Sequence, residues 1–168
     1  MAMLKIKESG MCFELSAAKT FAIERSRVYQ KINPHGVSAV EFITLGPRDD
    51  ILFVEAKTRA PNEDDPEGLA GFVGSISRKF IHSLEVCYAL LVRALPGNPD
   101  ESIPEAIKDK LMDKPTIKLI LIVNKLNPQH CAPLQDLLRK TLRAEERIWH
   151  MNVIVLNKEM AFRKHMVR

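Results

Sequence analysis

The chain has 168 residues, of which 46% are hydrophobic and 27% are charged, and its formal net charge is +4. This length and composition are typical of a globular protein with its own core, and we expect residues 1–168 to form a single domain. No apolar run approaches the eighteen residues of a membrane span and the N-terminus lacks the apolar core of a secretory signal, which favours a cytoplasmic protein without membrane partners.

Three cysteines, Cys12, Cys87 and Cys131, are scattered along the chain without the spacing of a zinc site. Their apolar neighbours predict buried free thiols. The chain also lacks the common motifs of nucleotide-binding proteins, zinc proteases and serine hydrolases, so those functional classes have no support.

In chain order, the first segment is ambiguous. Residues 11–15 fit a short strand, whereas residues 17–31 mix helix formers with β-branched residues and favour a helix or a strand-helix mixture. A turn at residues 33–36 closes this segment. Two apolar runs at residues 37–45 and 51–57 then flank a polar turn, a pattern that predicts a β-hairpin.

The second half of the chain alternates helical and strand patterns. After a polar loop at residues 60–68, apolar residues at steps of three and four predict a long helix over residues 71–95 that the segment 96–99 ends. The later predicted elements are a short helix at 103–112, a central buried strand at 117–123, an amphipathic helix at 133–147, a strand at 150–156 and a helical tail at 157–168. We therefore expect an α/β fold, with a mixed central sheet of about four to five strands flanked by helices.

An acid and an amine interrupt the apolar run of the second hairpin strand. Glu55 and Lys57 are two residues apart, so their side chains leave the same face of a sheet. Buried charges are costly unless they are paired, and a charged pair on this strand therefore indicates a function. The alternative is an exposed hairpin on which the two residues form a weak surface ion pair.

The acid Glu41 on the first predicted strand, followed by Glu55-Ala56-Lys57 on the second, resembles the PD-(D/E)xK nuclease superfamily. Glu41 takes the place of the usual Asp, and the Pro of the motif name is absent. Glu24 corresponds to the helical acid that often precedes the hairpin in that superfamily. The resemblance covers about residues 20–125 and implies a restriction-endonuclease-like core, in which the strand at residues 117–123 is the third strand.

The resemblance implies a metal-dependent nuclease, either an endonuclease or an exonuclease, that hydrolyses phosphodiester bonds of nucleic acid, with DNA favoured over RNA. Glu24, Glu41, Glu55 and Lys57 would form the catalytic set. Glu41, Glu55 and the backbone carbonyl of Ala56 would bind Mg²⁺, or Mn²⁺ in its place, because hard cations prefer oxygen ligands. Lys57 would orient or activate the attacking water. A domain this small is expected to need a homodimer or a partner protein to grip duplex DNA.

Basic residues offer further candidates for contacts with nucleic acid. Lys79 on the predicted long helix either points at the site or is a solvated lysine. Residues 114–168 hold 11 basic and 4 acidic residues, against 14 basic and 17 acidic in residues 1–113. Such a basic third fits a surface that follows phosphates, or simply a solvated face. Its two basic groups are Arg139, Lys140, Arg143 and Arg147, and Arg163, Lys164, His165 and Arg168.

Two alternatives to an active nuclease remain open. The first is a catalytically inactive member of the same fold that serves as a nucleic-acid-binding or protein-binding subunit, which the Glu at position 41 and the weaker match at Glu24 favour. The second is an unrelated α/β interaction domain in which the Glu-x-Lys spacing is accidental. Convergence of Glu41, Glu55 and Lys57 around an open site would favour the enzyme.

Overall fold

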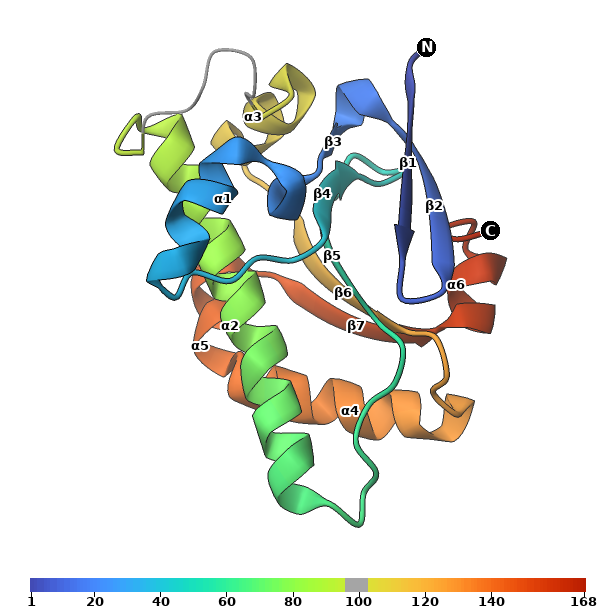
Figure 1. The fold of residues 1–168 in the computed structure, drawn as a ribbon. Helices are drawn as coiled ribbons and strands as arrows, with labels where there is room; N and C mark the ends of the chain where they lie inside the picture. The colour runs from blue at the N-terminus through green and yellow to red at the C-terminus, as the bar shows by residue number, and fades with distance from the viewer. Residues whose placement is uncertain (96–102) are drawn as a thin grey trace.

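A five-stranded mixed sheet forms the centre of the computed structural model, which describes residues 1–95 and 103–168 (Figure 1). Helices flank this sheet, so the predicted α/β class is confirmed. The strand order is β3-β4-β5-β6-β7. The bounds are β3 Thr20–Phe21, β4 Phe42–Leu45, β5 Ile51–Lys57, β6 Ile117–Val123 and β7 Asn152–Asn157.

Strand β5, which carries the Glu-x-Lys residues, lies inside the sheet. It pairs antiparallel with β4 and parallel with β6, which in turn pairs parallel with β7. The predicted hairpin is therefore confirmed, and the strand predicted at residues 117–123 lies next to its second strand in the sheet. Because β6 is buried on both faces, its sequence is a nearly continuous apolar run.

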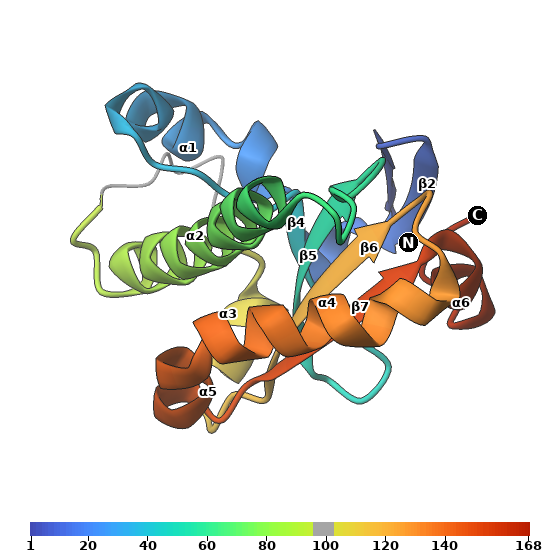
Figure 2. The ribbon, with the colours of Figure 1, turned by 90° about the horizontal axis from the view of Figure 1, so that it is seen from below.

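Helices cover one face of the sheet (Figures 1 and 2). Phe53 of β5 packs edge-on against Phe80 at a ring distance of 5.3 Å, and Leu134 and Leu138 belong to the same buried cluster. This packing fixes the side of β5 that faces the helices. The helices are α2 Pro66–Leu91, α3 Glu105–Met112, α4 Pro128–Thr141 and α5 Arg143–Trp149.

A second hairpin and the C-terminal helix cover the opposite face. Strands β1 (Met3–Glu8) and β2 (Met11–Ser16) form a separate two-stranded sheet, and α6 (Lys158–Arg163) lies beside it. Phe13 of this hairpin packs against Phe42 of β4, with ring centroids 5.1 Å apart. The two faces thus bury separate apolar clusters on either side of one sheet.

The segment between β2 and β4 is the strand-helix mixture, one of the two predictions for residues 17–31, and not a single helix. It contains the short strand β3 and several short turns of helix, because its β-branched residues and Ser26 interrupt any long helical run. Ser26 caps the first α-helix by accepting a hydrogen bond from the Tyr29 amide. The short helices are η1 Ala17–Lys19, η2 Ile23–Arg25, α1 Arg27–Ile32 and η3 Asn33–His35.

Several predicted boundaries are also corrected. Strand β4 begins at Phe42 rather than residue 37, and the helix predicted at 133–147 is in fact α4 followed by α5. Helix α4 begins at Pro128 because Asn127 caps it and proline suits the first helical turn. The predicted helix end at residues 96–99 lies outside the described residues.

The described chain contains no helix that is both long and apolar enough to cross a membrane. Cys87 and Cys131 are buried free thiols, as predicted, whereas Cys12 on β2 is only partly buried.

Candidate active site

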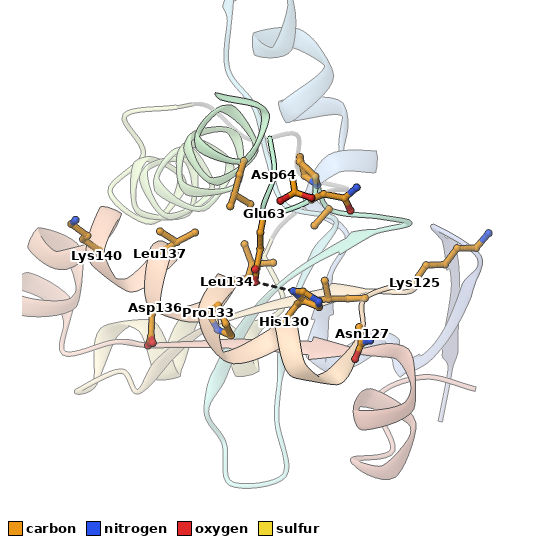
Figure 3. A pocket seen from close by; sticks show the side chains of 15 residues that line it. Glu63, Asp64, Lys125, Asn127, His130, Pro133, Leu134, Asp136, Leu137 and Lys140 are labelled. Atoms are coloured by element: carbon orange, nitrogen blue, oxygen red, sulfur yellow. Dashed lines mark hydrogen bonds and ion pairs between the residues drawn. The ribbon is translucent and has the colours of Figure 1, made fainter. Parts of the chain in front are cut away.

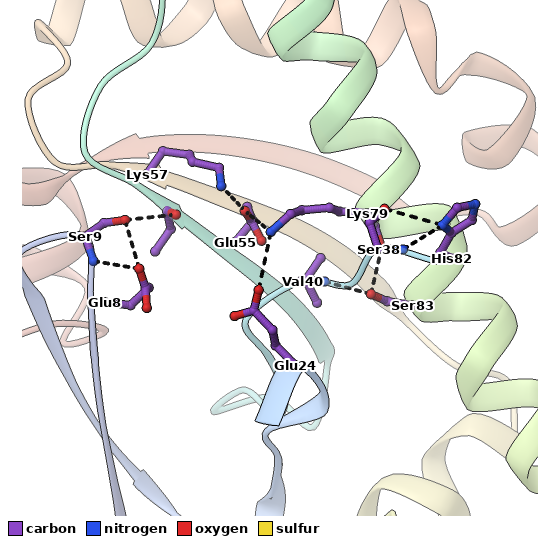
Figure 4. A network of polar contacts seen from close by, with 11 residues as sticks. Glu8, Ser9, Glu24, Ser38, Val40, Glu55, Lys57, Lys79, His82 and Ser83 are labelled. Carbon is purple, nitrogen blue, oxygen red and sulfur yellow. Dashed lines mark hydrogen bonds and ion pairs between the residues drawn. The ribbon is translucent and has the colours of Figure 1, made fainter. Parts of the chain in front are cut away.

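Glu55 lies at the centre of a cluster of charged side chains at the carboxyl end of β5 (Figure 4). Its side chain is 0% exposed, and its Oε1 lies 2.8 Å from Lys57 Nζ and 2.9 Å from Lys79 Nζ. These are ion pairs without full hydrogen-bond geometry. The buried Oε2 has no hydrogen-bond partner among residues 1–95 and 103–168. A buried carboxylate with an unsatisfied oxygen is costly, which indicates a functional requirement.

The alternation of β5 places both motif residues on the helix-covered face. Phe53 contacts Phe80 of α2, so Glu55 and Lys57 at successive odd positions point to the same side. Lys79 is the helix residue before Phe80 and therefore reaches Glu55. The resulting pair of lysines is asymmetric, since the Lys57 side chain is 33% exposed and the Lys79 side chain is 15% exposed.

Lys79 is held by more than one acid. Its Nζ lies 3.8 Å from Glu24 Oε1, in addition to the contact with Glu55. Burial alone would lower the pKa of Lys79, but the carboxylates of Glu55 and Glu24 outweigh burial and raise it. Lys79 therefore stays charged, and the interpretation of a solvated helix lysine is wrong.

Glu41 joins the cluster from the residue just before β4. Its amide donates a hydrogen bond to the Val54 carbonyl at 3.1 Å, which holds it alongside β5. Burial, a side-chain hydrogen bond with Glu24 and the charges of Glu55, Glu24 and Glu8 raise the pKa of Glu41 from 4.5 to about 9. The predicted residues Glu24, Glu41, Glu55 and Lys57 are thus brought together from three separate segments of the chain.

The tip of the β1–β2 hairpin adds two residues that the sequence analysis did not identify. Glu8 contributes negative charge beside Glu41, and Ser9 Oγ donates a hydrogen bond to the Ala56 carbonyl at 3.2 Å (Figure 4). The predicted ligand at the Ala56 carbonyl therefore already has a partner. A carbonyl oxygen has two lone pairs, so a metal ion would have to share it with Ser9.

The geometry of this hairpin tip explains how it reaches the site. Ser9 and Gly10 both have positive φ angles, of 49° and 73°, as the tightest hairpin turns require. Asn124 at the end of β6 donates from Nδ2 to the Ser9 carbonyl at 2.9 Å, and a Cβ on Gly10 would lie only 2.7 Å from that nitrogen. A Ser-Gly pair between alternating apolar residues is a hairpin signal, which is how the sequence could have revealed Glu8 and Ser9.

Ser83 on α2 holds the segment before Glu41 in place. Its Oγ accepts a hydrogen bond from the Val40 amide at 2.9 Å and donates one to the Lys79 carbonyl at 2.7 Å. We predict that Ser83→Ala lowers the free energy of unfolding by about 1–3 kcal/mol, because the buried Val40 amide loses its partner. Urea denaturation measures this loss.

Ser77 provides a matched control on the same helix. It is also buried, but its Oγ has no hydrogen-bond partner within the described chain. Ser77→Ala is therefore expected to leave stability unchanged or slightly higher. Equal losses in the two variants would contradict the role assigned to Ser83.

Several members of the predicted basic groups form ion pairs with acids of the same chain. Arg139 forms an ion pair with Glu146 at 3.0 Å, and Arg168 forms one with Glu14 at 2.7 Å. Arg163 is paired with Glu159. These contacts favour the interpretation of a solvated, self-neutralised surface for much of the basic third.

Two observations bear on whether the cluster suits a hard divalent cation. Carboxylate oxygens are the right donors, Glu55 Oε2 is buried without a partner, and Glu41 is held near other acids. Among the described residues, however, no three His, Cys, Asp or Glu side chains are close enough together to hold a metal ion. Oxygen donors of the kind that Mg²⁺ prefers are thus present, but not as a cluster of three among the described residues, and Lys57 and Lys79 already pair with Glu55.

Comparison of the chain with protein-family models, with curated proteins and with solved structures finds no match. A functional interpretation therefore depends on the geometry and electrostatics of the cluster.

Proposed function

We propose that the chain is a metal-dependent phosphodiester hydrolase of the PD-(D/E)xK type that acts on nucleic acid, with DNA favoured over RNA. The observation that carries this proposal is the convergence of Glu24, Glu41, Glu55 and Lys57 at the end of one buried strand. A structural ion pair would need one acid and one base. Here Glu55 pairs with both lysines and Glu24 with one of them, and Glu41 lies beside these acids and Glu8. A cation bound there would let Glu41 release its proton.

The two lysines have different tasks in this proposal. Lys57 is the more exposed of the two, so its ammonium group can reach a water molecule and a phosphate oxygen from solvent. There it orients the attacking water and stabilises the negative charge that develops on the phosphoryl group. Lys79 is largely buried and holds Glu55 in its position. It is a positioning residue.

Glu41 and Glu55 are the side chains that would hold Mg²⁺ or Mn²⁺, with the Ala56 carbonyl as a ligand shared with Ser9. When bound, the cation supplies polarisation of the phosphate and a lower pKa for its water. Glu24 shares a hydrogen bond with Glu41 and so governs whether Glu41 carries its proton.

The experiment that tests the function is cleavage of labelled single-stranded, duplex and branched DNA, and of RNA. Each substrate is incubated with the protein in Mg²⁺, in Mn²⁺ or in EDTA, with Glu55→Gln beside the wild type. We expect metal-dependent cleavage that disappears in the variant. Cleavage that persists in EDTA or in Glu55→Gln would exclude the proposed mechanism.

A specific observation favours a second candidate, an inactive relative of the same fold that binds nucleic acid or protein. Lys57 and Lys79 both form ion pairs with Glu55 Oε1. In the described part of the chain, no three His, Cys, Asp or Glu side chains are placed to bind a metal ion together. A folded wild-type protein that cuts none of the substrates under any metal condition would support this second candidate.

A further inference from the structure

A cavity of about 690 Å³ lies beside the candidate site, between the loop after β5 and the first turns of α4 (Figure 3). Its volume is in the range of small-molecule and cofactor sites. The loop residues 60–64 form one wall, and residues 125–127, which follow β6, continue it toward α4. The cavity thus opens at the carboxyl ends of two parallel strands, where open α/β sheets bind their ligands.

The cavity and the candidate site share one face of the sheet. Leu134 of the cavity wall belongs to the same buried cluster as Phe53, which lies on the face of β5 that Glu55 and Lys57 share. Ala60 in the wall is three residues after Lys57, so their Cα atoms are at most about 11 Å apart. The Asn124 amide donates a hydrogen bond to the Lys57 carbonyl at 2.8 Å. This bond connects the end of β5 to the segment after β6, which lines the cavity.

The lining combines apolar walls with charged ends. Leu69, Leu134 and Leu137 line the cavity, and Leu137 remains 38% exposed. Figure 3 shows Lys140 and Lys125, both exposed, at opposite ends of the row of lining residues. Between the lysines lie these leucines and three carboxylates, Glu63, Asp64 and Asp136. A strand would place its phosphates at the two lysines and its bases against the leucines and carboxylates between them.

Polar groups in the cavity suit the edges of bases. Glu63 and His130 join the two walls through a hydrogen bond of 2.9 Å between Oε1 and Nδ1, and Asp136 lies on the α4 side. Carboxylates accept hydrogen bonds from the amino groups of bases. In a duplex, base faces are stacked and base edges are paired, so only unpaired nucleotides can use both the leucines and these acceptors.

From these features we infer that the cavity binds unpaired nucleotides of a strand that leads into the Glu55–Lys57 site. This inference rests on the proposed hydrolase function and deepens it, because it names single-stranded nucleic acid, or the unpaired end of a duplex, as the substrate class. The shared chemistry is that of a nucleotide, so a free mononucleotide is the competing ligand to be tested.

The test measures binding of labelled single-stranded and duplex oligonucleotides to the wild-type protein in EDTA by fluorescence anisotropy. Leu137→Glu places a charge against the base faces and is expected to raise the Kd for the single strand about tenfold. The Kd for the duplex stays unchanged. Phe162→Glu is the matched control, because Phe162 is an exposed apolar residue on α6, outside the cavity lining.

Three outcomes would overturn the inference. The first is that Leu137→Glu binds the single strand as tightly as the wild type does. The second is that Phe162→Glu loses as much affinity for the single strand as Leu137→Glu. The third is that nucleoside monophosphate displaces the labelled strand at lower concentrations than unlabelled strand does. A cavity that serves a protein partner predicts the first of them. Circular dichroism spectra identical to those of the wild type establish that both variants are folded.

The failure of this inference is distinguishable from failure of the proposed function. If cleavage of single strands requires Lys57 but proceeds equally in wild type and Leu137→Glu, the hydrolase proposal stands and the strand-binding role of the cavity is rejected. If the protein never cuts but its binding of single strands depends on Leu137, the strand-binding role of the cavity stands and the hydrolase proposal is rejected.

Discussion

Lys57→Ala is expected to lower the rate of metal-dependent cleavage by about 10²–10⁴-fold, the range for loss of a group that assists proton transfer or stabilises developing charge. The fold should be preserved. The Lys57 side chain is 33% exposed, and Glu55 keeps its ion pair with Lys79 at 2.9 Å when Lys57 is removed. Initial cleavage rates in Mg²⁺, together with thermal denaturation, measure both parts of this prediction.

Lys5→Ala is the appropriate control for this experiment. Lys5 is also a strand lysine paired with a glutamate, but its side chain is 58% exposed and lies 3.6 Å from Glu14 on the β1–β2 hairpin. Its loss should change neither the cleavage rate nor the stability by a measurable amount. If Lys57→Ala cuts at the wild-type rate, Lys57 has no role in the chemistry and the proposed mechanism is wrong.

The strands that carry and neighbour the motif could be predicted closely because their sequence signals are strong. The residue bounds of β5 and β6 agree with the apolar runs, since a buried strand leaves little ambiguity when it is rich in β-branched residues. The side of the sheet that each β5 residue faces also follows from alternation. Glu55 and Lys57 on one face could therefore be foreseen from spacing alone.

Long-range contacts could not be predicted in the same way. The sequence contains the Ser9-Gly10 turn, but nothing local places its tip beside Ala56, a contact between residues 47 positions apart. Likewise, only the fold determines that Glu41 meets Glu24 and Glu8, and therefore that its pKa rises. Such pairings depend on how the two faces of the sheet are covered.

Lys79 was accessible to a stricter sequence argument. It follows Phe72 by seven positions and Ile76 by three, so it belongs to the stripe of α2 that faces the sheet. A lysine on such a stripe requires an acid opposite it when it is buried. Applying the helical period to Lys79 as well as to the apolar residues would have predicted its contact with the acid on β5.

The raised pKa of Glu41 makes the metal-free protein less stable as the pH rises. The folded state holds the Glu41 proton up to a pKa of about 9, whereas the unfolded chain releases it near 4.5. Between these values the folded state binds more protons than the unfolded state, so stability decreases with increasing pH. At pH 7 the cost is about 3 kcal/mol, because each unit of pKa shift corresponds to about 1.4 kcal/mol.

Glu41→Gln should remove this cost while preserving the shape of the side chain. Gln can still donate a hydrogen bond to Glu24, as protonated Glu41 does, and it carries no charge near Glu55 or Glu8. We predict that the variant in EDTA is more stable than the wild type by about 3 kcal/mol at pH 7, with a difference that shrinks toward pH 5. Urea denaturation across this pH range measures it.

A divalent cation should act on the wild type in the opposite sense. A bound cation favours ionised Glu41, so Mg²⁺ or Mn²⁺ is expected to stabilise the wild type increasingly as the pH rises and to release a proton on binding. Glu41→Gln should lose most of that stabilisation together with cleavage, whereas Glu85→Gln, at an exposed position of α2, should behave like the wild type. Equal stabilisation of Glu41→Gln and wild type by the cation would show that Glu41 is no ligand. If Glu41→Gln is more stable than the wild type in EDTA but no longer binds the cation, Glu41 serves function at a cost in folding stability.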